Sequence, residues 1–431
     1  MDKPNLEWAI RTLRQPAGPA REYANPEAIE EHQEDFIRAF HSSLKELHAE
    51  AIRTILVMET MLRKTPPDPS AATVNDYIQI WRRVNDTIVW IILSGQRHVI
   101  KTLCHFKRRG PLANHGLSAV AHAMDELNAN PYGIAICTDA TSCVDIGDIV
   151  HVDKMVGRTS LIEVKSGHVN EQIISSEMFG INDFIARYGQ HGAEQVARYA
   201  RQRKRMLQTL GVLNQDEGID VLSGQPIRLV DCQVPDEDYD TELRDLLAEA
   251  RSKEDVLGSV DGCLWIYATR NTGQSRESIR KRFRDKVLAM AQGPISDWLR
   301  KDLSSPAAEP TFSLQDTLYY PFAIPIFLRG IEDDDTLDII GGRSLVLMMF
   351  DWGRFQKLVR HTGAELRWSS SKAGRRAKST SRYLRPLIIR GLVPQIYSEN
   401  QSFDVGAPQF FRILYDGLRP SCWARQLSEL P

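Results

Sequence analysis

Cysteine is scarce and scattered in this sequence. The chain of 431 residues has six cysteines, and no two of them form a Cys-x-x-Cys pair. Zinc centres and disulfide frameworks need closely spaced cysteines, so neither is expected here. Isolated cysteines of this kind indicate reduced thiols, which are typical of cytoplasmic proteins.

Long apolar runs and an N-terminal signal are also missing. The clearest apolar run, "IVWIIL" at 88–93, is far shorter than the ~20 residues that span a bilayer. The first residues, "MDKPNLEWAI", lack the basic and then apolar pattern of a signal peptide. The sequence therefore predicts a cytoplasmic protein with no membrane partner.

A strong excess of one charge is absent too. The 54 Lys and Arg residues are balanced by 56 Asp and Glu residues, which gives a formal net charge of -2. Nucleic-acid binding would therefore depend on local clusters of basic residues. The sequence has no GxxxxGK(S/T) phosphate-binding loop. A motor activity would have to come from a partner protein, which could also supply regulation.

The spacing of apolar residues predicts a helical N-terminal region, residues 1–112. Apolar residues at steps of three and four indicate two long helices, at 27–63 and 71–104, separated by "KTPPDPS". Two such helices with a short connection form an antiparallel hairpin. The hairpin would serve either as a self-association surface, giving a homo-oligomer, or as a cover for the rest of the chain.

Two further regions follow, because the chain exceeds the usual domain size of roughly 100–200 residues. Region 113–275 is predicted to be a mixed α/β domain, and region 276–431 a C-terminal α+β domain that binds nucleic acid or a partner. The elements expected in the middle region are a helix at 117–129, strands at 133–137, 146–152 and 160–165, a helix near 192–210, and strands at 226–232 and 263–269.

Two neighbouring strands of the middle region carry acidic residues. Asp148 and Glu163 lie on strands that the turn-like "DKMVGRT" could join as a hairpin, which would bring both carboxylates together. Adjacent carboxylates repel unless a cation lies between them, and hard oxygen ligands suit Mg²⁺ or Mn²⁺. Lys165 lies two positions after Glu163 and therefore on the same face of the predicted strand.

The pattern of Asp, a gap and then Glu-x-Lys, present here as "IGDIVHV" and "IEVKSG", resembles the PD-(D/E)xK nuclease superfamily. The order of elements is similar to the αβββαβ mixed-sheet core of that restriction-endonuclease-like fold. Gln195 and Tyr199 resemble the supporting Gln-x-x-x-Tyr signature of its exonuclease-like branch. The resemblance covers residues 113 to about 235. Gly147 stands where the family has proline, which leaves Asp145 as a substitute ligand.

The resemblance implies a Mg²⁺-dependent or Mn²⁺-dependent nuclease that hydrolyses DNA phosphodiester bonds. Asp148 and Glu163 would hold the metal, with the Val164 carbonyl and Glu126 completing the site. Lys165 would position or deprotonate the attacking water, or stabilise charge on the phosphate. Similar stand-alone nucleases act in bacterial defence against phage, so the resemblance also implies an antiviral role.

Two clusters of basic residues are expected to bind DNA phosphates. One lies in the helix after the acidic motif, and the other lies in the Gly/Ser/Arg-rich segment 369–382. Their members are Arg198, Arg201, Arg203, Lys204, Arg205, Arg375, Arg376 and Lys378.

Other interpretations of these residues stay open at the level of sequence. Glu-x-Lys on a strand is often only an ion pair at a sheet edge. The same fold also occurs in RNA-cutting enzymes, and a degenerate copy would be a non-catalytic nucleic-acid-binding protein. Cys143 lacks a recognisable catalytic partner. The nearby histidines, His122, His151 and His168, lack zinc-binding spacing and are better explained by packing or surface exposure.

Overall fold

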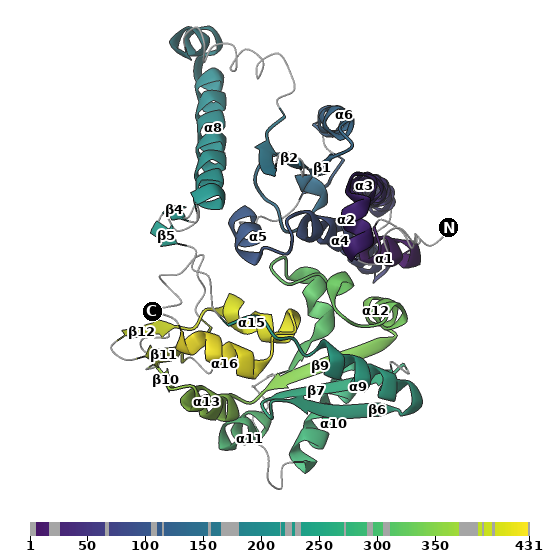
Figure 1. Ribbon diagram of the computed structural model, residues 1–431, viewed down its shortest axis with the longest axis vertical. Coiled ribbons are helices and arrows are strands. Elements are labelled where there is room, and N and C mark those ends of the chain that lie inside the picture. The colour runs from purple at the N-terminus through teal and green to yellow at the C-terminus, as the bar shows by residue number, and fades with distance from the viewer. Residues whose placement is uncertain are drawn as a thin grey trace. The chain divides into compact units, whose positions relative to one another are not determined.

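The computed structural model shows a mixed α/β protein with several small antiparallel sheets (Figure 1). It divides into two compact units, Met1–Leu229 and Val230–Pro431. The structure describes residues 6–16, 26–64, 69–104, 110–113, 116–153, 157–164, 181–215, 217–219, 226–228, 234–270, 273–290, 296–304, 311–369, 387–389, 392–398 and 401–429. No helix in these ranges is long and apolar enough to cross a membrane.

The first unit begins with helices that form its apolar core. Two of them, α3 (Gln33–Lys64) and α4 (Pro69–Ile92), pack together as the predicted hairpin. Trp81 and Trp90 on α4 are buried inside this unit, so they are not part of an exposed surface. The shorter helices of this unit are α1 (Leu6–Arg14), α2 (Pro26–Glu31), α5 (Arg97–Leu103) and α6 (Leu117–Asn128).

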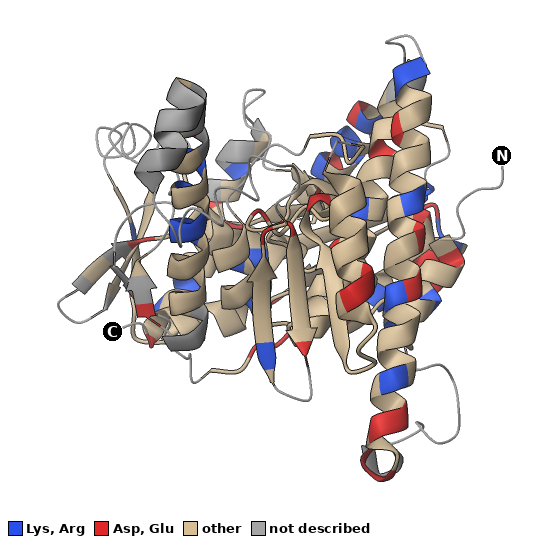
Figure 2. Cartoon of the chain, turned by 90° about the horizontal axis from the view of Figure 1, so that it is seen from above, with Lys and Arg blue, Asp and Glu red and all other residues tan. Residues whose placement is uncertain are grey.

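A three-stranded antiparallel sheet follows, in the order β1-β2-β3. The strands carry charge only at their ends, where Asp153 of β2 pairs with Arg158 of β3. In Figure 2 the bodies of the strands are mostly tan, and blue and red lie mainly on helices, loops and strand ends. Helices α6 and α3 pack against β1. The strands are β1 (Gly133–Cys137), β2 (Ile149–Asp153) and β3 (Arg158–Ile162), with a short 3-10 helix η2 (Thr138–Ala140) after β1.

A long helix and a small strand pair complete the first unit. Helix α8 (Ile181–Gln215) extends well beyond the helix expected at 192–210. Strands β4 (Glu217–Ile219) and β5 (Pro226–Arg228) pair only with each other in the part of the chain that the structure describes. The fourth strand of an αβββαβ core is therefore not joined to β1-β2-β3 among these residues.

The second unit is built on the antiparallel sheet β6-β7-β9-β8. Strand β9 (Ser344–Phe350) is formed by the apolar stretch "SLVLMMF", and every residue in it is buried. Trp265, Tyr267 and Phe283 are among the aromatic side chains of the core. The other strands of the sheet are β6 (Asp255–Val260), β7 (Leu264–Arg270) and β8 (Thr311–Ser313).

Helices and a second small sheet, β10-β11-β12, surround this core. The elements are α9 (Asp240–Ser252), α10 (Arg276–Ala289), α11 (Asp297–Ser304), α12 (Asp333–Ile340), α13 (Trp352–His361), α15 (Ala407–Tyr415) and α16 (Pro420–Ser428), with β10 (Glu365–Trp368), β11 (Pro394–Ser398) and β12 (Gln401–Asp404). The two region boundaries expected from the sequence, after residues 112 and 275, both fall inside the compact units. The reason is that α3 packs on β1, while β7 pairs with β9.

Candidate functional site

The candidate site begins at the end of the central strand β2. One position before Ile149, the backbone of Asp148 is held from both sides. Its carbonyl accepts a hydrogen bond from the Thr138 amide at 3.0 Å, and its amide donates to the Ile162 carbonyl at 2.8 Å. Because both backbone groups are paired, the position of the Asp148 side chain is well defined by the sheet.

The Asp148 carboxylate itself ends the pairing with β3. Its Oδ2 accepts a hydrogen bond from the Val164 amide at 2.7 Å. Glu163 directly precedes Val164, and the last paired residues at this end of the two strands are Ile149 and Ile162, so Asp148 and Glu163 each lie one residue beyond that pair. The β2–β3 hairpin therefore brings the two acidic residues to the same end of the sheet, and Glu163 lies just after β3, not within it.

Glycine at position 147 is required by the local backbone. Gly147 has φ +70°, and a Cβ added there would lie 3.0 Å from the Ile162 carbonyl oxygen. Proline fixes φ near −65° and cannot adopt this conformation. The departure from the family pattern at this position thus has a steric cause: the chain turns sharply against β3 before it enters β2.

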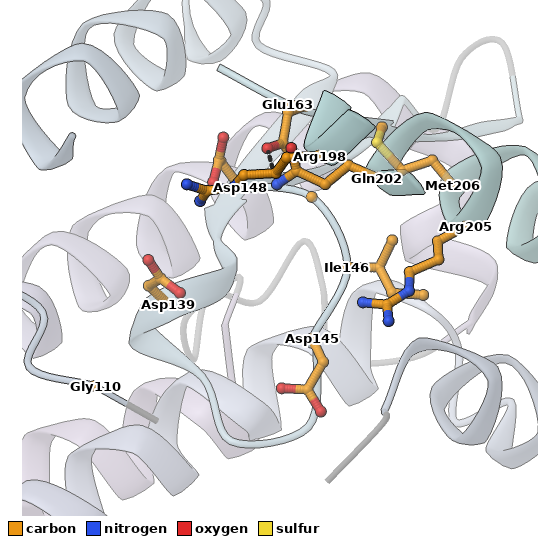
Figure 3. A pocket seen from close by; sticks show the side chains of 11 residues that line it. Gly110, Asp139, Asp145, Ile146, Asp148, Glu163, Arg198, Gln202, Arg205 and Met206 are labelled. Carbon is orange, nitrogen blue, oxygen red and sulfur yellow. Dashed lines mark hydrogen bonds between the residues drawn. The ribbon is translucent and has the colours of Figure 1, made fainter. Parts of the chain in front are cut away.

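Helix α8 supplies the opposite side of the site. Gln202 Nε2 donates a hydrogen bond to Glu163 Oε1 at 2.8 Å. Arg198 and Arg205 lie one turn to either side of Gln202 and therefore on the same helix face. Figure 3 shows these side chains and those from the strand ends around one space, with the Gln202–Glu163 hydrogen bond dashed.

The space between these elements is a pocket of about 260 Å³. Its lining combines carboxylates from the sheet side with two arginines from α8. The lining residues are Gly110, Asp139, Asp145, Ile146, Gly147, Asp148, Glu163, Arg198, Gln202, Arg205 and Met206. Neither Arg198 nor Arg205 forms an ion pair with an acidic side chain among the described residues. Both guanidinium groups can therefore bind a phosphate.

The loop that leads to Asp148 is held by polar residues of α4. Asp86 accepts hydrogen bonds from the Ser142 amide at 2.6 Å, from the Cys143 amide at 3.0 Å and from the Ser142 hydroxyl. It also pairs with Arg83 at 2.7 Å, and both side chains are fully buried. A buried charge needs such partners, so this loop and α4 depend on each other.

Neighbouring residues of α4 hold backbone carbonyls of the same loop and of Gly110, which also lines the pocket. Arg82 donates to the carbonyls of Asp139 at 2.6 Å and Gly110 at 3.0 Å, and it lies 3.8 Å from Glu59 of α3. Asn85 donates to the Ala140 carbonyl at 2.9 Å. The hairpin predicted as a self-association or covering element therefore also serves as the scaffold of the pocket.

A buried histidine joins α3 to the end of β1. His48 Nε2 accepts a hydrogen bond from the Cys137 amide at 3.0 Å, and Nδ1 lies 2.8 Å from Asn85 Oδ1. This arrangement requires the neutral ring with its proton on Nδ1. Burial lowers the pKa of His48 to about 4, while the Asn85 hydrogen bond opposes that shift. His48 is thus a structural residue and not a proton-transfer group at neutral pH.

The cysteines near the pocket are poor nucleophiles. Burial raises the pKa of the Cys137 thiol to about 11, and the charges of Asp139 and Asp148 act in the same direction. Burial likewise raises the pKa of Cys143, which lies beside Asp86. Only thiolates are effective nucleophiles, so these thiols do not offer a cysteine-based mechanism.

The carboxylate oxygens of the pocket are the kind of ligand that binds divalent cations. Asp148 and Glu163 are both carboxylates, and a carboxylate that accepts one hydrogen bond retains the capacity to bind a cation. Within the described residues, no group of three or more His, Cys, Asp or Glu side chains is close enough to hold a metal ion. The carboxylates of Asp148 and Glu163 are thus the side chains that would hold Mg²⁺ or Mn²⁺, whereas Val164, whose amide faces Asp148, is not among the residues that line the pocket.

Other residues expected at the site have different positions. Glu126 forms an exposed ion pair with His122 on α6 and is not among the residues that line the pocket. Val120 and Met124 are the buried residues of that helix, so Glu126 projects to solvent on another face. The structure does not bring it to Asp148 and Glu163.

The basic and supporting residues of the motif are only partly described. Arg201, Arg203 and Lys204 are exposed on α8 and do not line the pocket, whereas Tyr199 is half-buried on the same helix. The expected residues outside the described part of the chain are Lys165, Arg375, Arg376, Lys378 and the side chain of Gln195.

Gln202 is the pocket residue that the motif search missed. A signal for it was present, because Gln195, Arg198, Gln202 and Arg205 follow one another at steps of three, four and three. That spacing places them on one face of a helix.

Comparisons with known proteins add no relative: the chain matches no family model, and neither a curated protein nor a solved structure is significantly similar to it.

Proposed function

We propose that this protein is a metal-dependent nuclease that hydrolyses phosphodiester bonds of DNA. The observation that carries the proposal is that Asp148 and Glu163, from the same end of the β2–β3 hairpin, line one pocket together with Arg198 and Arg205. Carboxylates on one side and guanidinium groups on the other match the two components of such a reaction, a divalent cation and an anionic phosphate.

The residues have distinct roles in this proposal. Asp148 and Glu163 hold the cation. When bound, Mg²⁺ or Mn²⁺ supplies a Lewis acid that polarises the phosphodiester and makes water a better nucleophile at neutral pH. Arg198 and Arg205 bind the phosphate oxygens and hold the scissile bond against the carboxylates.

Lys165 retains its proposed role from the sequence motif. It would position or deprotonate the attacking water, or stabilise charge that develops on the phosphate. The resemblance to the PD-(D/E)xK superfamily supports this assignment through "IEVKSG". The Lys165→Ala variant separates this role from metal binding, because it keeps both carboxylates: Mn²⁺ should still bind while turnover collapses.

The decisive experiment is a cleavage assay on purified protein. Supercoiled DNA, linear DNA and RNA are each incubated with Mg²⁺, Mn²⁺ or EDTA. We expect DNA cleavage that EDTA abolishes and that Asp148→Asn and Glu163→Gln both remove. Glu126→Gln is the matched control, since it neutralises a carboxylate away from the pocket and should leave cleavage unchanged.

Two outcomes would contradict the proposal. Full cleavage by both Asp148→Asn and Glu163→Gln would mean that the carboxylate pair is only structural. Cleavage of RNA without cleavage of DNA would assign the site to the other substrate, since phosphate chemistry alone does not distinguish the two sugars.

A further inference from the structure

Gln202 connects α8 to one of the two carboxylates of the pocket. Its Nε2 lies 2.8 Å from Glu163 Oε1, and both side chains are half-buried. A carboxylate only accepts hydrogen bonds, so the amide nitrogen and not the amide oxygen must face it. The chemistry of the contact therefore fixes the orientation of the Gln202 amide.

We propose that Gln202 is a positioning residue that holds Glu163 in its metal-binding conformation. This inference rests on the proposed function, because it assigns Glu163 to the cation. Glu163 lies just after the last residue of β3, and the hydrogen bond from Gln202 restricts the rotamers of its long side chain. Asp148 is fixed by the Val164 amide, whereas Glu163 is fixed from α8.

The uncharged character of Gln202 is essential to this role. A lysine or arginine at the same place would bind Glu163 as a counter-ion and compete with the cation for the carboxylate. An amide donates a hydrogen bond without neutralising the negative charge. The arginines of the same helix face, Arg198 and Arg205, form no ion pair with an acidic residue in the described ranges. On this face of α8, Gln202 therefore contacts the carboxylate, and the two arginines are left to bind the phosphate.

The contact also couples the two sides of the pocket. Arg198 and Arg205 lie on the same face of α8 as Gln202, one turn away in either direction. A hydrogen bond from Gln202 to Glu163 thus links the helix face that carries both arginines to the end of the sheet that carries the carboxylates. Partners that orient metal ligands in this way typically change metal affinity by about 10-fold to 100-fold when they are removed.

The test compares Gln202→Met with Gln208→Met. Methionine has nearly the length and flexibility of glutamine but donates no hydrogen bond. Gln208 lies on α8 but does not line the pocket, so it provides the same substitution away from the site. Mn²⁺ binding is measured by calorimetry without substrate, and cleavage is measured as a function of Mn²⁺ and DNA concentration.

We expect Gln202→Met to bind Mn²⁺ about 10-fold to 100-fold more weakly than the wild type, whereas Gln208→Met binds it normally. Saturating Mn²⁺ should restore much of kcat, and the KM for DNA should change little because both arginines remain. A purely structural role would not produce rescue by Mn²⁺. If Gln202→Met does not fold, Gln202→Asn provides the second variant, since its amide is one carbon too short to reach Glu163.

The outcomes distinguish this inference from the proposed function. If Glu163→Gln abolishes Mn²⁺ binding while Gln202→Met matches the wild type, the positioning role is refuted and the nuclease proposal stands. If the wild-type protein binds no Mn²⁺ and cleaves neither DNA nor RNA, both proposals fail together.

Discussion

The Asp86 carboxylate of α4 accepts hydrogen bonds from the backbone amides of Ser142 and Cys143, at 2.6 and 3.0 Å, in the loop that leads to Asp148. The partner of its charge is Arg83, which is equally buried. Helix α4 is distant in sequence from the acidic motif, yet these contacts make it a structural support of the pocket.

Removing the Asp86 carboxylate should destabilise the protein strongly. Asp86→Ala removes the carboxylate that faces the buried Arg83 charge and two loop amides, which costs about 3–5 kcal/mol. Urea denaturation of the variant measures this loss. Asp125→Ala, an exposed aspartate on α6, is the control and should change the free energy of unfolding by less than about 0.5 kcal/mol. A similar small change in Asp86→Ala would disprove the scaffold role.

The neutral state of His48 predicts a specific pH dependence of stability. Its pKa is about 4 in the folded protein and about 6.5 when unfolded, so the unfolded chain binds the extra proton between these values. The contribution is therefore complete above pH 6.5 and is lost as the pH falls toward 4, by about 3 kcal/mol. His48→Gln should flatten this part of the curve, as followed by urea denaturation at several pH values. Parallel curves for the two proteins would show that His48 does not titrate in this range.

The close approach of Gly147 to β3 can be separated from its backbone conformation. Gly147 and Gly157 both have positive φ, but only Gly147 has a neighbour in the way of a Cβ. Gly157→Ala should cost about 1 kcal/mol from the left-handed backbone alone. Gly147→Ala should cost about 1–3 kcal/mol more because of the clash with Ile162, and it should also lower DNA cleavage. If Gly147→Ala and Gly157→Ala lose the same stability in thermal unfolding, the backbone at Ile162 shifts at little cost to make room for the added Cβ.

The arginines of the pocket should differ from the other basic residues of α8. Arg198→Ala and Arg205→Ala should each raise the KM for DNA about 10-fold, as expected for the loss of a hydrogen bond to a charged group. Each should also reduce the slope of binding against salt concentration by about 1. Arg201→Ala and Lys204→Ala, exposed outside the pocket, are the matched controls. Equal effects in both pairs would indicate a nonspecific electrostatic surface.

The strands of the site were predictable because their residue pattern is local. The prediction of a strand at 133–137 is confirmed by β1, and the strand predicted at 263–269 is confirmed, one residue further along, by β7. The hairpin between β2 and β3 follows from a turn-like segment between two short apolar runs. Its register was not predictable in detail, because the Asp148 carboxylate and Gly147 reshape the last pair.

The role of α4 could not be read from the sequence. "WRRVND" at 81–86 interrupts an apolar stripe with charged residues, which by pattern alone indicates an exposed face. The residues are buried because the loop after β1 presents backbone groups that pair with them. Such pairing depends on which distant segment lies opposite, and helical periodicity contains no information about that.

Arg82 and Asn85 hold the pocket loop through carbonyl oxygens of its backbone and not through its side chains. These two contacts therefore do not depend on which side chains stand at Asp139 and Ala140, so long as the backbone keeps its conformation. The Asp139 carbonyl accepts a hydrogen bond from Arg82, and Asp139 also lines the pocket. Position 139 is thus one at which substitution could change substrate preference without loss of the fold. The same separation would let a laboratory selection randomise this position while α4 maintains the loop.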